Sequence, residues 1–195
     1  MSTAPRAAQT TKGGRTLLAL LAVFALPLLL AWVFTMGPLD WRPVKSVNHG
    51  VLLEPPLQLK SYGVMDAAGA ALTVKAVARD WFLVVLHGTV CAEPCQGLLR
   101  IAERIQIAVG RDTRRVTLAL LGPDNDALAP RRQSWLLPED GKLVRELRRA
   151  MGEPQLDTVL LIVDHQGRII LMYPPTEGGP GMLSDLKRLL RSSAR

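Results

Sequence analysis

The chain contains only two cysteines, Cys91 and Cys95, and they lie four positions apart. The apolar run 81–86 before them predicts a buried strand, and the segment 97–105 after them predicts a helix. Two thiols between a strand and the N-terminus of a helix are placed for redox or soft-metal chemistry. The positive end of the helix dipole and its free N–H groups favour thiolate over thiol. We therefore predict that this pair is the chemical site.

The sequence pattern alone allows three roles for the cysteine pair. In a redox site one thiolate attacks a substrate disulfide and the other resolves the mixed disulfide. The position nearer the strand end favours Cys91 as the attacking thiol and Cys95 as the resolving one. In a copper site two soft thiolates would select Cu(I). In a structural disulfide, so short a loop would stabilise the fold by only roughly 2 kcal/mol.

The three histidines and one glutamate are the other groups that bear on this site. His87, four residues before Cys91, is expected either to contact the thiols or a metal, or to lie hydrogen-bonded under the loop. His49 precedes the domain and is a weaker candidate for a metal ligand over the site. His165 falls in a predicted hairpin turn and is expected to be exposed. Glu93, between the cysteines, would raise the pKa of a thiol by like-charge repulsion.

The N-terminal part of the chain predicts a membrane anchor. Residues 16–36 carry no charge, and at 1.5 Å per residue they span about 30 Å, the thickness of a bilayer core. No small-x-small site ends this stretch, which favours an uncleaved anchor over a signal peptide. The leader 1–15 carries Arg6, Lys12 and Arg15 and no acidic residue, so the positive-inside rule places it in the cytoplasm. We therefore predict a single-pass inner-membrane protein with a periplasmic C-terminal domain.

The charge of the chain limits the class of its partners. Of the net charge of +7, the leader supplies three positive residues, so the exported part is only modestly basic. No basic run alternates with aromatic residues, which argues against nucleic acid as a partner. The lipid bilayer is the partner that the anchor itself predicts.

The exported part predicts an α/β domain at 57–195, joined to the anchor by a linker at 37–56. The expected strands are 82–86, 115–121, 158–163 and 168–173, the expected helices are 94–109, 141–151 and 182–191, and a small hairpin is expected between 57–59 and 71–74. Buried strands separated by helices imply parallel pairing, and two consecutive strands joined by a tight turn imply antiparallel pairing. This order predicts a thioredoxin-like mixed sheet flanked by helices, preceded by one transmembrane helix.

The chain resembles the Sco/SenC group of membrane-anchored, thioredoxin-fold proteins that help to assemble cytochrome c oxidase. The resemblance covers roughly residue 51 to the end, through WFLVVLHGTVCAEPC, RVTLALL and VLLIVDHQGRII. Its most specific motif is T-x-C-x-x-x-C, at Thr89, Cys91 and Cys95. That family binds copper through both thiolates and one distant histidine, and some members are thiol-disulfide reductases instead. The resemblance therefore implies copper as a ligand and an oxidase subunit or another assembly factor as a partner.

The chain departs from that family at the residues around the cysteines and at the third copper ligand. The family commonly has a proline after each cysteine, where this chain has Ala92 and Gln96. Counting back from Asp164 places the family's histidine near Leu156, and the segment 153–157 contains no histidine. Of the family's three copper ligands, the resemblance therefore assigns only the two cysteines to this chain. We predict a thiol-disulfide oxidoreductase, which needs no cofactor, with a Cu(I) chaperone and a non-catalytic assembly scaffold as the alternatives.

Overall fold

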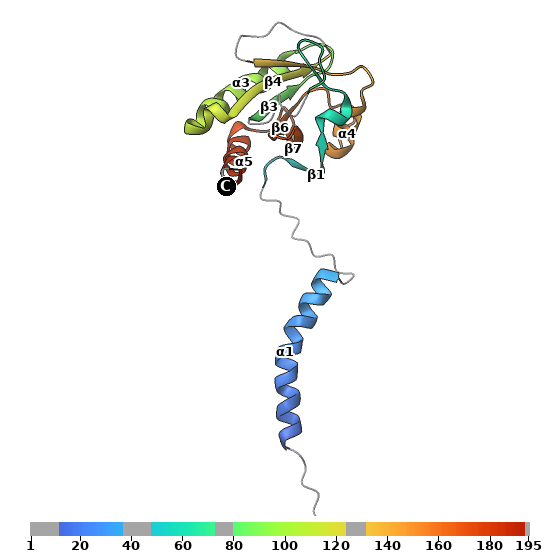
Figure 1. Cartoon of the computed structure of the whole chain (residues 1–195), viewed down its shortest axis with the longest axis vertical. Helices are drawn as coiled ribbons and strands as arrows, with labels where there is room; N and C mark the ends of the chain where they lie inside the picture. Colours follow the sequence, from blue (N-terminus) through green and yellow to red (C-terminus); the bar gives the residue numbers. More distant parts are fainter. Residues whose placement is uncertain (1–11, 37–47, 73–79, 124–131, 194–195) are drawn as a thin grey trace, which may run out of the picture. The chain divides into compact units, whose positions relative to one another are not determined.

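The computed structural model describes residues 12–36, 48–72, 80–123 and 132–193 (Figure 1). The chain divides into two compact units, Met1–Lys45 and Ser46–Arg195. The first unit contains α1 (Lys12–Met36), a helix of 25 residues with Pro27 inside it. Among the described residues, no helix is both long and apolar enough to cross a membrane.

The second unit is built on one mixed sheet, which has seven strands within the described residues, in the order β1-β7-β6-β3-β4-β5-β2. The strands are β1 (Val51–Gln58), β2 (Met65–Asp66), β3 (Trp81–Leu86), β4 (Val116–Gly122), β5 (Arg132–Leu136), β6 (Val159–Val163) and β7 (Arg168–Tyr173). The helices in the described part of this unit are α3 (Glu93–Ala108), α4 (Lys142–Met151) and α5 (Gly179–Ser192), with short 3-10 helices η1 (Leu59–Tyr62) and η2 (Gly110–Arg115). Strands β3, β4 and β5 are parallel to one another, and the remaining pairs are antiparallel.

The central strand β3 is buried along its whole length, which explains its uninterrupted apolar sequence. Its residues point alternately to two hydrophobic cores. Phe82, Val84 and Leu86 pack in the core beneath α4, whereas Leu83 and Val85 pack in the core beneath α3 and α5. The sheet is therefore the middle layer, with α3 and α5 on one face and α4 on the other (Figure 1). Both cores lie wholly within the second unit, so a fragment of residues 46–195 retains the complete core.

The predicted thioredoxin-like mixed sheet flanked by helices is confirmed. The unit β3-α3-β4 is parallel, and β6 and β7 form an antiparallel hairpin followed by α5. Helix α5 begins at Gly179, three residues before the predicted start, because Pro180 is accommodated in the first turn, where the missing N–H forms no helical bond. Strand β5 was not expected, since only Trp135 of its five residues is buried.

The hairpin predicted between residues 57–59 and 71–74 is wrong. Leu57 and Gln58 belong to β1 and pair with β7, at the opposite edge of the sheet from β2. A smaller turn does form, in which Asp66 Oδ1 accepts hydrogen bonds of 2.9 Å from the backbone N–H groups of Ala68 and Ala70. Residues 73 and 74 lie outside the described part. Strand β1 also extends to Val51, so the sheet begins within the segment that we predicted as a linker.

Candidate functional site

The two cysteines form a disulfide, and they differ in burial. Their Cα atoms are 5.1 Å apart. Cys95 lies in the first turn of α3 and is fully buried, whereas Cys91 lies in the loop before the helix and is only partly buried. This is the relative exposure that the sequence predicts for an attacking and a resolving thiol. The roles themselves stay a prediction.

The loop closes because Cys91 is outside the helix. Side chains at i and i+4 within a helix have Cβ atoms about 5–6 Å apart, too far for a disulfide. Pro94 does not act as a helix breaker here; it occupies the first turn of α3, where no helical hydrogen bond is lost. The side chain of Gln96 donates a hydrogen bond of 3.3 Å to the carbonyl oxygen of Cys91, which ties the loop to the helix.

The electrostatic environment of the pair is set mainly by the end of α3. No side chain caps this end, because Ala92 precedes the first helical residue. Glu93, which alone would disfavour a thiolate, forms an ion pair of 2.7 Å with Arg100 one to two turns further along the helix. Both partners are largely exposed, so the pair is screened by water. The pairing reduces the repulsion between Glu93 and a thiolate, and the dipole of α3 acts in the opposite direction to that repulsion by favouring the thiolate.

His87 is buried as predicted, but it is not hydrogen-bonded through its ring. It is 1% exposed, and within the described residues neither ring nitrogen has a hydrogen-bond partner. The ring packs directly on Gly122 of β4, where an added Cβ would lie 2.1 Å from Nε2. Leu118 and Leu120 alternate with Gly122 along β4 and face the α3 side, so the imidazole lies on that same face of the sheet, as do the cysteines.

The other two histidines are held away from the cysteines. His165 is not fully exposed as expected, because it packs edge-on against Trp81 with ring centroids 6.5 Å apart. Trp81 is the first residue of β3 and Cys91 follows its last, so His165 and Cys91 lie at opposite ends of this strand. His49 contacts α5 through Asp185. Among the described residues, no group of three or more His, Cys, Asp or Glu side chains is arranged to hold a metal, so the structure does not join His87 or His49 to the cysteines.

The position that the family resemblance gives to a third copper ligand is part of the core. Leu156 is 4% exposed and packs beneath α4, as its apolar side chain requires. The two cysteines are thus the soft ligands that this part of the fold supplies. Two thiolates are sufficient for two-coordinate Cu(I) and insufficient for Cu(II).

Asp185 accepts a cluster of hydrogen bonds that the sequence did not reveal. Its buried carboxylate accepts bonds from the backbone N–H of His49 at 2.7 Å, the backbone N–H of Gly50 at 3.2 Å and the hydroxyl of Tyr173 at 2.9 Å, and its Oδ1 lies 3.2 Å from His49 Nδ1. We call these four residues the Asp185 clamp. Tyr173 pairs with Leu160 of β6, whose other neighbour is Val85 of β3. Tyr173 therefore lies at the same end of the sheet as the loop that follows β3, with its strand about 10 Å from β3, two strand spacings away.

The clamp shifts the pKa values of both of its buried acidic groups. Burial and then the charge of Asp185 raise the pKa of Tyr173 well above its ordinary value, so the hydroxyl remains a donor. Burial alone would raise the pKa of Asp185, but the hydrogen bonds from His49, Tyr173 and Gly50 outweigh it and hold that pKa below its ordinary value. The folded state thus favours an ionised Asp185.

A cavity of about 200 Å³ opens at the carboxyl ends of β3, β4 and β5. Gly88 and Thr89, which lead into Cys91, form part of its lining. Arg148 of α4 lines it as well, held by bonds of 2.9 Å to the carbonyl oxygen of Leu156 and 2.8 Å to Asp157. The carboxyl ends of parallel strands are the usual place for ligands in α/β sheets.

The fold and the cysteine pair define a thioredoxin-like domain that carries a C-x-x-x-C disulfide at the start of α3. A family described as "Transmembrane-like, thioredoxin-like, C-terminal domain" matches residues 81–193. The chain belongs to this family. No curated protein matches the chain.

Solved structures similar to the chain include Sco proteins and peroxiredoxins. ScoI of Bradyrhizobium japonicum with copper bound is 16% identical, with a TM-score of 0.43, over 68% of this chain and 96% of that one. ScoI of Arabidopsis thaliana with copper bound is 12% identical, with a TM-score of 0.47, over 73% of this chain and 99% of that one. A mutant of Xanthomonas campestris peroxiredoxin Q is 12% identical, with a TM-score of 0.45, over 74% and 98%. Sco proteins, to which the sequence shows a resemblance, are thus among the similar solved structures, each at less than 25% identity.

The contact between His87 and Gly122 gives a test of the buried imidazole. We expect Gly122→Ala to lower the free energy of unfolding of residues 46–195 by about 1–3 kcal/mol, because the new methyl group overlaps the ring. In a His87→Ala background the same substitution should cost less than about 0.5 kcal/mol, since the overlap is gone. Urea unfolding followed by circular dichroism measures both differences. Equal costs in the two backgrounds would show that the ring does not lie on Gly122.

The lowered pKa of Asp185 predicts a pH-dependent contribution to stability. At pH 7 we expect Asp185→Asn to be about 2 kcal/mol less stable than the wild type, because hydrogen bonds to a buried charge are lost. This contribution is present above the ordinary aspartate pKa of about 3.9 and is lost as the pH falls through the lower pKa of the folded state. The two unfolding curves should therefore converge in acid. Glu153→Gln, at an exposed position, is the control and should track the wild type throughout.

Proposed function

We propose that the chain is a membrane-anchored thiol-disulfide exchange protein that acts through Cys91 and Cys95. The observation that carries this proposal is the closed disulfide between a partly buried Cys91 and a fully buried Cys95 at the start of α3. A pair whose only role was to stabilise the fold would cross-link distant segments, because a longer closed loop gives more stabilisation. This disulfide closes a loop of five residues, and Gly88 and Thr89, which precede that loop, line a cavity at the carboxyl ends of the parallel strands.

The exchange reaction follows from the positions of the two sulfurs. In the reduced protein the Cys91 thiolate attacks one sulfur of a substrate disulfide, forming a mixed disulfide and releasing one substrate thiolate. The Cys95 thiolate then attacks Cys91 Sγ, which restores the internal disulfide and releases the second substrate thiolate. Two electrons pass from the protein to the substrate. The same steps in reverse oxidise a substrate dithiol, and the relative reduction potentials set the direction.

The burial of Cys95 gives the order of attack a physical basis. A sulfur that is fully covered cannot reach a substrate disulfide, but it can reach Cys91 within the same loop. The cavity lined by Gly88 and Thr89 would give a substrate segment a place to lie near the loop that leads into Cys91. The dipole of α3 stabilises whichever thiolate is formed.

The anchor and the cellular role extend this proposal. Residues 16–36 would cross the inner membrane with the leader 1–15 in the cytoplasm, and residues 46–195 would then act in the periplasm. The uncharged run, the basic leader and the transmembrane-like description of the family support this arrangement. The resemblance to Sco proteins supports a role in the biogenesis of cytochrome c oxidase, with an oxidase subunit or another assembly factor as the partner.

Copper handling is the second candidate function, and it uses the same two residues. Once reduced, Cys91 and Cys95 supply two soft sulfur ligands from one short loop, a set that suits Cu(I). Copper would then be the cargo of a chaperone. A scaffold that has lost both activities is the third candidate. It would retain the fold and the clamp and would not need either thiol.

The cysteine variants separate these functions. In the full chain, reduced and placed in lipid nanodiscs, we expect Cys95→Ser to accumulate a mixed disulfide with a model peptide disulfide, because the resolving step is lost. Cys91→Ser should form no mixed disulfide, and neither variant should turn over. Mass spectrometry of the quenched reaction measures the adduct, and the wild type with both thiols alkylated is the control.

The same samples decide between exchange and copper delivery. Tight binding of one Cu(I) per chain, lost in either variant, together with no exchange, would replace the proposal by copper delivery. If neither exchange nor copper binding were observed, the non-catalytic scaffold would be the remaining candidate function. Mixed-disulfide formation by Cys91→Ser instead of Cys95→Ser would reverse the assigned roles.

A further inference from the structure

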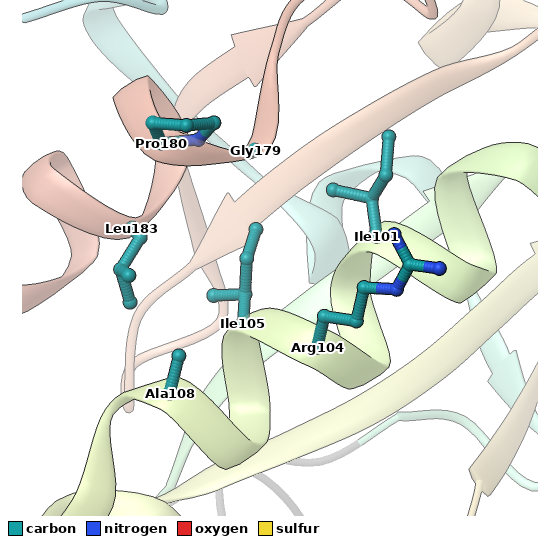
Figure 2. Close-up of a pocket in the computed structure, with 7 residues that line it drawn as sticks. All are labelled: Ile101, Arg104, Ile105, Ala108, Gly179, Pro180 and Leu183. Atoms are coloured by element: carbon teal, nitrogen blue, oxygen red, sulfur yellow. The ribbon is translucent and has the colours of Figure 1, made fainter.

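A second cavity lies far along α3 from the cysteines, in the groove between α3 and α5. Its volume is about 330 Å³, and it is lined by Ile101, Arg104, Ile105, Ala108, Gly179, Pro180 and Leu183. Figure 2 shows the side chains of α3 on one side of the groove and those of Pro180 and Leu183 of α5 across from them. We call it the α3–α5 groove.

The close approach of the two helices at one end creates this groove. A Cβ added to Gly179 would lie 3.4 Å from Ile101 Cγ2, so the helices nearly touch where α5 begins. Toward Ala108 and Leu183 the lining residues are only partly covered or exposed. Ile105, at 3% exposure, is the buried member of the set. The groove is therefore an open slot with an apolar lining.

The residues that line the groove are nearly all apolar. Six of the seven residues are aliphatic or glycine, and Arg104 provides the charge. Within the described part of the chain, Arg104 forms no hydrogen bond and no ion pair, in contrast to Arg100 one turn earlier, which pairs with Glu93. A ligand that fits must bring an apolar body without internal polar groups, since a buried hydroxyl or amide would have no partner among these side chains. A negative group on the ligand would pair with the exposed guanidinium of Arg104.

The size of the groove selects a small ligand over a protein partner. A volume of about 330 Å³ is at the lower end of the range of roughly 300–1,000 Å³ for small-molecule sites. A stable protein interface buries more than about 1,000 Å² and needs a wider surface. One unbranched hydrocarbon chain matches a narrow aliphatic slot. A carboxylate matches a guanidinium, which binds it through two parallel hydrogen bonds.

We propose that the α3–α5 groove binds a single-chain fatty acid, with the carboxylate on Arg104 and the hydrocarbon chain along Ile105, Ala108 and Leu183. This site is separate from the disulfide and does not depend on thiol exchange. It would give the domain a means of sensing or carrying free fatty acids released at the membrane.

Photolabelling of the full chain tests this site. The probe is dodecanoate with a terminal diazirine, added to the protein in nanodiscs of zwitterionic lipid, irradiated, and mapped by peptide mass spectrometry. We expect labels on the segments that contain residues 101–108 and 179–183. Unlabelled dodecanoate should compete, and dodecanol, which lacks the charge, should compete about tenfold more weakly.

Four variants give matched comparisons at exposed positions, where folding is not at risk. Arg104→Glu, which reverses the charge, and Ala108→Phe, which fills the slot, should each reduce labelling of the groove about tenfold. The controls are Arg111→Glu, which makes the same charge reversal, and Ile107→Phe, which introduces the same phenyl group at an exposed position; both lie outside the lining and should label as the wild type does. Labelling that is confined to residues 1–45, or is equal in all four variants, or is blocked equally by dodecanol, would overturn the proposal.

Discussion

The burial of β3 on both faces is the constraint on which the rest of the domain depends. A strand covered by α3 and α5 on one side and by α4 on the other must be apolar at every position, and Trp81–Leu86 meets that requirement. Such a strand can end only where the two cores end, and the chain there must turn outward. The residues after Leu86 therefore form the loop at the carboxyl edge of the sheet, and the helix that returns over β3 begins with Cys95 in its first turn. The position of the cysteine pair therefore follows from the burial of β3 between the two layers of helices.

The sequence was sufficient for the elements whose patterns are local. The apolar run before the cysteines, the helix after them and the turn Asp164–Gly167 each depend on neighbouring residues, and all three are present. Strand β5 was missed because its sequence, apart from Trp135, is polar and partly exposed at the side of the sheet. Its position depends on pairing with β4 and β2, which no local pattern reports.

Contacts between distant residues account for the larger omissions at the site. His49 and Asp185 are 136 positions apart, so neither could be recognised as part of a hydrogen-bonded cluster. His87 was expected to be buried, which its place at a strand end indicates. The contact of its ring with Gly122 depends on the register of β3 against β4, which the sequence does not report. The same holds for the lack of a hydrogen-bond partner for the ring among the described residues. The pairing of Glu93 with Arg100 likewise changes the balance of charge around the thiols, and it requires knowing where α3 begins.

The Asp185 clamp has a mechanical consequence for any pull on the domain from its N-terminal side. A pull on the chain before Asn48 reaches His49 and Gly50 first, and these are fastened to the carboxylate of Asp185 on α5. The load then passes into β1, which pairs with the outer side of β7. Strands β7 and β6 lie between β1 and β3. Such a force would be carried by α5 and by the outer strands β1 and β7, and the loop that holds the disulfide would lie outside its path.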